Sequence, residues 1–101
     1  MIRHVVFFKF KPEVPAEEWK SALDALRALP GKIDVIRAFE VGENILPSTR
    51  AWDAVLLAMY DDLEALQEYS LHHEHVAVAG RLKAVCESIG SVDYEDVTPR
   101  R

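Results

Sequence analysis

The sequence predicts an α+β protein in which helices cover one face of a four-stranded antiparallel sheet. Three observations carry this prediction. Apolar and polar residues alternate in short strand-like segments, helical patterns with apolar spacings of three and four lie between them, and proline and glycine separate several of the segments. With 101 residues, half of them hydrophobic, the chain is expected to form a single domain over residues 1–101.

The first predicted strand covers residues 1–11 and stops at Pro12. Its apolar side chains occupy both faces of the strand. One face carries Ile2, His4, Val6, Phe8 and Phe10, and the other carries Val5 and Phe7. We therefore expect both faces of this strand to be covered.

A helix and a second strand follow. Pro15 starts the helix, and apolar residues recur in it at helical spacing as far as Leu29. The pair Pro30-Gly31 ends the helix. Residues 33–41 then alternate between apolar and other side chains, which predicts the second strand.

The third predicted strand is residues 52–60, a nearly continuous apolar run after a polar loop. Asp61 and Asp62 can cap a short helical segment over residues 63–69. A second helical pattern covers residues 75–86, and residues 91–95 alternate as the last strand before the terminal tail.

The order strand, helix, strand, strand, helical segment, strand is typical of the ferredoxin-like sandwich. Helices can cover only one side of its sheet. Apolar side chains of the first and third strands, or those opposite them, then remain on the other side: Val5, Phe7, Trp52, Leu56 and Tyr60. Because an uncovered apolar face promotes association, we predict a symmetric homodimer in which two sheets face each other.

Composition argues against several partners. A net charge of −5 and a pI near 5.3 disfavour nucleic acid. No apolar stretch approaches the roughly 20 residues that span a bilayer, so we expect a cytoplasmic protein without a membrane partner. Cys86 is the only cysteine and falls on an apolar helical stripe, which indicates a buried structural thiol. We expect no cofactor.

The candidate functional residues cluster in the second half of the chain. Tyr69, His72, His73 and His75 lie within seven residues of one another, and the fourth histidine, His4, lies on the first strand. Histidine and tyrosine can exchange protons with a bound molecule. In one straight helix, Tyr69 and His75 would point about 240° apart, so a break over residues 71–73 is needed to bring them together.

Several segments resemble the stress-responsive dimeric A/B barrel domain family. They are Met1 to Lys11, Leu29-Pro30-Gly31, Phe39 to Gly42, Asp53 to Leu56, and Tyr69-x-x-His72-x-x-His75. The resemblance covers essentially the whole chain, although His73 stands where a proline is common. It implies a ferredoxin-like protomer that pairs through its sheets into a dimeric barrel, with a small apolar cavity between sheet and helices.

The final third is also similar to the plant polyketide cyclases that form olivetolic acid, including Asp93-Tyr94 and Thr98-Pro99-Arg100. This resemblance implies that His75 is a general base for an intramolecular aldol closure and that Tyr69 holds or polarises a carbonyl. It also matches His4 to a pocket histidine. His4 and His72 are therefore candidate substrate-binding residues.

Each of these residues also has a structural interpretation. His75 lies on an apolar stripe and can be a hydrogen-bonded core histidine, as can His4, and Tyr69 can anchor a helix end. His72 and His75 are three residues apart, but no third metal ligand is at a recognised spacing, so we expect no metal site. Two functions stay open: a cofactor-free cyclase or lyase acting on a polyketide-like carbonyl compound, and a noncatalytic stress-responsive protein or binder of a small hydrophobic ligand.

Overall fold

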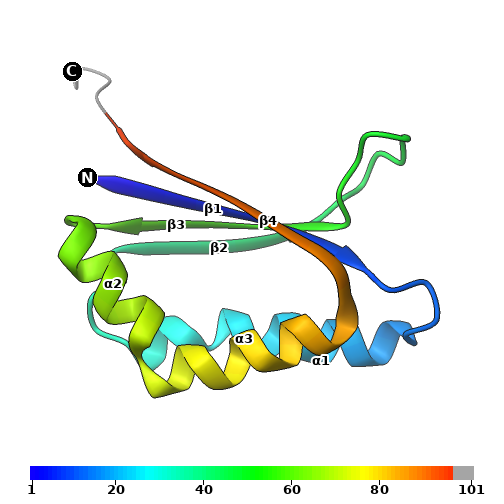
Figure 1. Cartoon of the computed structure of the whole chain (residues 1–101), viewed down its shortest axis with the longest axis horizontal. Helices are drawn as coiled ribbons and strands as arrows, with labels where there is room; N and C mark the ends of the chain where they lie inside the picture. Colours follow the sequence, from blue (N-terminus) through cyan, green and yellow to red (C-terminus); the bar gives the residue numbers. More distant parts are fainter. Residues whose placement is uncertain (97–101) are drawn as a thin grey trace.

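A computed structural model describes residues 1–96, in which three helices lie on one face of a four-stranded antiparallel sheet (Figure 1). The strands are β1 (Ile2–Phe10), β2 (Ala38–Glu43), β3 (Ala54–Tyr60) and β4 (Cys86–Glu95), and the helices are α1 (Ala16–Arg27), α2 (Leu63–Leu71) and α3 (His73–Val85). The strand order β2-β3-β1-β4 confirms the predicted ferredoxin-like arrangement. The predicted tail, with Thr98-Pro99-Arg100, lies outside the described residues.

The first helix follows the predicted pattern but ends earlier than expected. Its inner stripe, Ala22, Leu23 and Leu26, is buried against the sheet. The helix stops at Arg27, and Leu29–Gly31 form a 3₁₀ turn. Pro30 has no backbone N–H to donate, so the α-helical hydrogen bonds cannot continue through it.

The second strand is shifted from its predicted position, residues 33–41, to Ala38–Glu43. Ile33 is buried in the core, and its N–H donates to the carbonyl of Leu29 at 3.0 Å, which continues the preceding turn. Pairing with β3 begins only where the N–H of Arg37 donates to the carbonyl of Met59 at 2.9 Å. Ile33 is therefore a core residue outside the sheet, which explains why its alternation with its neighbours was misleading.

The last strand is longer than predicted, because β4 starts at Cys86 directly after α3. Cys86 is buried, as expected, but it belongs to the strand and pairs with Phe10 after a register shift in β1. Residues 86–90 carry little apolar alternation. Pairing with β1 keeps them extended, and this tertiary effect overrides their weak local pattern.

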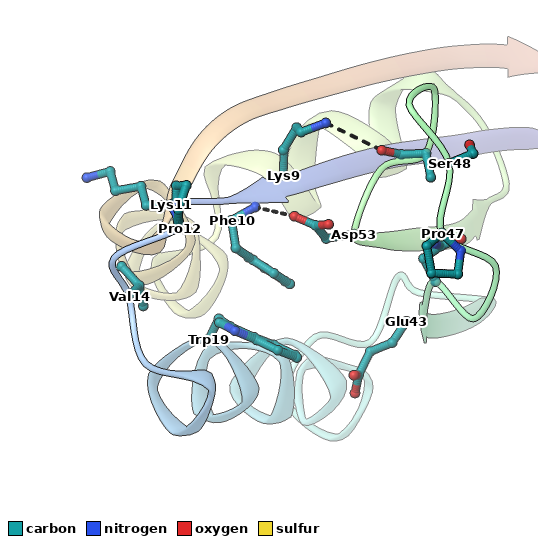
Figure 2. A pocket seen from close by; sticks show the side chains of 12 residues that line it. Lys9, Phe10, Lys11, Pro12, Val14, Trp19, Glu43, Pro47, Ser48 and Asp53 are labelled. Carbon is teal, nitrogen blue, oxygen red and sulfur yellow. Dashed lines mark hydrogen bonds between the residues drawn. The ribbon is translucent and has the colours of Figure 1, made fainter.

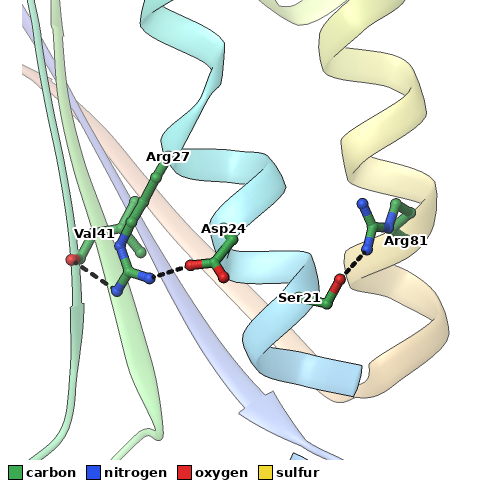
Figure 3. Close-up of polar contacts among 5 residues, drawn as sticks. All are labelled: Ser21, Asp24, Arg27, Val41 and Arg81. Atoms are coloured by element: carbon green, nitrogen blue, oxygen red, sulfur yellow. Dashed lines mark hydrogen bonds and ion pairs between the residues drawn. The ribbon is translucent and has the colours of Figure 1, made fainter. Parts of the chain in front are cut away.

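The core lies between the inner sheet face and the helices. The buried residues on the sheet side are Ile2, Val6, Phe8, Phe10, Ala54, Leu56, Ala58, Tyr60 and Cys86. Polar contacts fasten α1 on both flanks (Figure 3). Arg27 contacts Asp24 at 3.1 Å and donates to the Val41 carbonyl of β2 at 3.4 Å, while Arg81 of α3 donates to Ser21 at 2.8 Å.

The outer face of the sheet is mostly apolar, with Arg3, Lys9 and Glu40 among its residues, and has no helix over it in the described part of the chain (Figure 1). From the strand register, it carries Val5, Phe7, Val55, Leu57, Met59, Val92 and Tyr94. Trp52 packs beside Phe7 with ring centroids 5.9 Å apart. Of the two sets left open for the third strand, the set opposite Leu56 and Tyr60 lies outside. Leu56 and Tyr60 themselves are buried under the helices, because inward residues of β3 fall at even positions.

Candidate functional site

The helical break predicted over residues 71–73 is present at His72. This residue has extended backbone angles, φ −62° and ψ 135°, between α2 and α3. Its Nδ1 accepts a hydrogen bond from the Glu74 N–H at 3.1 Å and so caps α3. The turn brings Tyr69 and His75 together, with ring centroids 4.4 Å apart.

Tyr69 and His75 line a cavity of about 120 Å³ between the inner sheet face and the helices. His4 and Lys83 are the other ionisable residues of its wall, and the rest of the lining is apolar and comes from β1, β3, β4, α1 and α3. An apolar cavity of roughly 150 Å³ can hold a benzene molecule. The cavity is therefore of the size class that accepts about one six-membered ring.

His75 is held in one neutral tautomer. Its Nδ1 lies 2.9 Å from the carbonyl oxygen of Ser70, and a carbonyl only accepts hydrogen bonds. Nδ1 therefore carries the hydrogen and Nε2 has the free lone pair. Burial lowers the pKa of His75 below 6.5, the Ser70 carbonyl opposes that change, and the charges of His4 and Lys83 add to the lowering. At neutral pH the imidazole is an uncharged base.

Tyr69 is a phenol rather than a phenolate at neutral pH. Its side chain is buried, and burial raises the pKa to about 12, with Tyr60 opposing the rise. The neighbouring Tyr60 ring is 5.0 Å away. The buried Tyr60 hydroxyl has no hydrogen-bond partner of good geometry within residues 1–96. Burial is the main cause of the raised pKa of Tyr60, and the neighbouring Tyr69 adds to the rise.

His4 lies on the opposite wall, with its ring centroid 6.0 Å from that of Tyr69. Its Nδ1 pairs with the carboxylate of Asp93 on β4, the residue directly across from it in the strand register. This pair fixes the imidazole from outside the cavity. Sequence reasoning did not identify Asp93 as part of the site, since only the β1–β4 register places it there.

His72 is separated from the other candidates. It does not line the cavity, and its side chain is used in the helix cap. His73 is largely exposed and stacks on His72, with ring centroids 4.6 Å apart. Within the described range 1–96, no three His, Cys, Asp or Glu side chains are arranged to hold a metal ion. No helix in that range is long and apolar enough to cross a bilayer.

A second, more open hollow of about 510 Å³ lies at the other end of β1 (Figure 2). Asp53 accepts from the Phe10 N–H there at 2.7 Å, and Lys9 reaches the carbonyl of Ala51 at 3.5 Å. Trp19 stacks on Phe10 with ring centroids 4.5 Å apart. These contacts fix the end of β1. No histidine or tyrosine lines the hollow. The smaller cavity, which His4, Tyr69 and His75 line, is therefore the better candidate for a site of acid–base chemistry.

Comparison with known proteins gives consistent relatives. Residues 2–96 match the family model described as the stress responsive A/B barrel domain. An uncharacterized protein of Streptomyces coelicolor is 37% identical over 79 residues, which are 76% of this chain and 81% of that protein. A dimeric protein of unknown function with a ferredoxin-like fold from Bacteroides fragilis is 39% identical, with a TM-score of 0.82 over 94% of this chain and 95% of that one.

A hydroxynitrile lyase from Passiflora edulis has a TM-score of 0.86 over 98% of this chain and 96% of its own. Only 13% of the aligned residues are identical, so this likeness concerns the fold alone.

Proposed function

Because this chain belongs to the stress responsive A/B barrel domain family, we propose that it is a small, cofactor-independent dimeric barrel protein that performs acid–base catalysis on a polyketide-like carbonyl compound. The observation that carries the proposal is the contact between Tyr69 and His75 on the wall of an apolar cavity. A neutral base and a protonated phenol side by side are the two groups that an aldol or lyase reaction requires.

In the proposed reaction, the free lone pair of His75 Nε2 takes a proton from a carbon that lies between two carbonyl groups. Tyr69 donates a hydrogen bond to the enolate oxygen. For the linear compound methyl 3,5,7-trioxooctanoate, the electron pair left on C2 forms a bond to C7, and the C7 oxygen takes up a proton. Loss of one water and enolisation then give methyl 2,4-dihydroxy-6-methylbenzoate.

The surroundings of the pair suit this chemistry. The His75–Ser70 hydrogen bond keeps Nδ1 protonated, so the proton is accepted at the other ring nitrogen. His4, which Asp93 holds on the opposite wall, is proposed to bind a substrate oxygen. His72 is not assigned a contact with substrate, because it caps α3 outside the cavity. The cavity volume of about 120 Å³ limits the reacting part of the substrate to about one ring.

The dimer belongs to the same proposal. The outer sheet face exposes 44% of Leu57, 54% of Val92 and 47% of Tyr94, and these residues lie on one continuous apolar surface. A second copy of the chain would bury it. The similar protein from Bacteroides fragilis is dimeric, which supports pairing. The cavity lies on the helical side, so pairing through the outer face leaves it accessible.

The alternative function is noncatalytic binding of a small hydrophobic ligand by a stress-responsive protein. The mostly apolar lining of the cavity favours it. A binder would hold the trioxo ester or its cyclic product without accelerating the cyclisation, so turnover separates the two functions.

Tyr69→Phe tests the proposed donor. We expect a loss of about 10²–10³-fold in kcat for cyclisation of the trioxo ester, because one hydrogen bond to the developing oxyanion disappears. The matched control is Tyr94→Phe, which removes a phenol hydroxyl on the outer sheet face, away from the cavity. Its kcat should stay near wild type. Equal losses in both variants would refute the role of Tyr69.

A further inference from the structure

We propose that Lys83 makes the cavity selective for keto acids, by binding a substrate carboxylate at the cavity mouth. The inference rests on the function proposed for Tyr69 and His75 and adds the charge class of the substrate. Lys83 is the only lysine or arginine that lines this cavity in the described part of the chain.

Exposure of the lining residues locates the mouth. Lys83 of α3 and Ile89 of β4 are exposed, whereas every other residue of the wall is buried or half-buried. The two residues flank the junction at Val85 and Cys86, where α3 ends and β4 begins, and the two elements diverge from that point (Figure 1). The cavity therefore opens between α3 and β4, with the lysine on one side of the opening.

The Lys83 ammonium has no partner among the residues that the structure describes. Within residues 1–96 it makes no hydrogen bond or ion pair, whereas Lys32 pairs with Glu74 at 3.6 Å and Arg81 bonds Ser21 at 2.8 Å. The carboxylate near the far wall, Asp93, is engaged with His4. In a chain with a net charge of −5, an unpaired cation at this opening is a specific attraction for an anion.

The spacing along α3 fits a carboxylate attached to the reacting carbon. Lys83 is eight positions after His75, a rise of about 12 Å along α3. Both side chains incline toward the N-terminus, but the lysine is longer and reaches back further, which shortens the gap between the ammonium and the imidazole. A base about 3–3.5 Å from a carbon, followed by its carboxylate and a charged hydrogen bond of about 2.8 Å, spans roughly 6–8 Å. The lysine would also disperse carboxylate charge beside the carbon that loses its proton.

The electrostatic effect of Lys83 on the pKa of His75 supports a short distance between the two side chains. Burial is the main cause of its lowered pKa, and the charge of Lys83 is among the smaller causes. The two groups are therefore close enough to influence one molecule in the cavity.

The test compares 3,5,7-trioxooctanoate with its methyl ester in the wild type, in Lys83→Met and in the control Lys20→Met. Both substitutions remove one positive charge from an exposed lysine, but Lys20 lies over Trp19, away from the cavity. We expect the ratio of kcat/KM for acid over ester to fall about ten-fold or more in Lys83→Met, because a charge-assisted hydrogen bond is lost. Lys20→Met should keep the wild-type ratio. An unchanged ratio in Lys83→Met would overturn the proposal.

A binding measurement separates this inference from the catalytic one. Calorimetry with 2,4-dihydroxy-6-methylbenzoate and its methyl ester needs no turnover. If Lys83→Met binds the acid more weakly but the ester as tightly as the wild type does, the lysine site is supported. This holds even if the wild type turns over neither trioxo compound, a result that would refute only the proposed catalysis. Equal affinities for acid and ester in the wild type would overturn the lysine site while leaving catalysis of the ester intact.

Discussion

His75→Ala is expected to lower kcat for cyclisation of the trioxo ester by about 10²–10⁴-fold, because it removes the general base. The folded protein should survive this change. The side chain is only half-buried, and its hydrogen bond goes to the Ser70 carbonyl at the surface of the α2–α3 turn. Steady-state kinetics and thermal denaturation of the same preparation measure both effects.

The pH profile of the wild type gives a second readout of His75. The imidazole acts only when it is uncharged, and burial lowers its pKa below 6.5. Turnover should therefore stay level from neutral pH down to about 6.5 and fall only below it, as His75 becomes protonated. The residual activity of His75→Ala should lack this acid limb.

His73→Ala is the matched control for this histidine. Its side chain is 84% exposed and lies outside the cavity, so kcat should remain at the wild-type value. If His75→Ala instead lowers the free energy of unfolding by several kcal/mol, the histidine is a structural residue and the catalytic interpretation fails.

Leu57→Lys is expected to convert the dimer into monomers. Leu57 lies on the outer sheet face opposite Val5, within the apolar surface proposed to contact the partner copy. In a twofold interface the substitution places a lysine on each copy, and burying an unpaired charge costs several kcal/mol. Light scattering after size-exclusion chromatography measures the molecular mass directly.

The control for the interface is Val76→Lys on α3. Val76 is 57% exposed on the helical side of the molecule, which the proposed dimer leaves in solvent. This variant should remain a dimer. A wild-type protein that elutes as a monomer, or a Leu57→Lys variant that stays dimeric, would contradict pairing through the outer sheet face.

Much of the fold could be predicted from local patterns. The alternation in residues 2–10 and the helical spacing of Ala22, Leu23 and Leu26 are properties of single elements, so the sequence contains them in full. The break at His72 was predictable because a straight helix would separate Tyr69 from His75.

The errors arose where contacts between residues distant in sequence determine which element a residue belongs to or which way it faces. Ile33 alternates with its neighbours like a strand residue, yet it packs into the core after the 3₁₀ turn. The strand assignment of Cys86 depends on pairing with β1, and the inward side of β3 depends on its register. For the same reason, Asp93 beside His4 and Lys83 at the cavity mouth emerged only from the three-dimensional arrangement.

A crystal structure of the protein soaked with 2,4-dihydroxy-6-methylbenzoate tests the central claim most directly. We predict density for the ring in the cavity between β1 and α3, with a ligand oxygen within hydrogen-bond distance of the Tyr69 hydroxyl and a ring carbon facing His75 Nε2. A ligand found only in the open hollow beside Trp19, or a cavity that stays without ligand at saturating concentration, would contradict catalysis at this site.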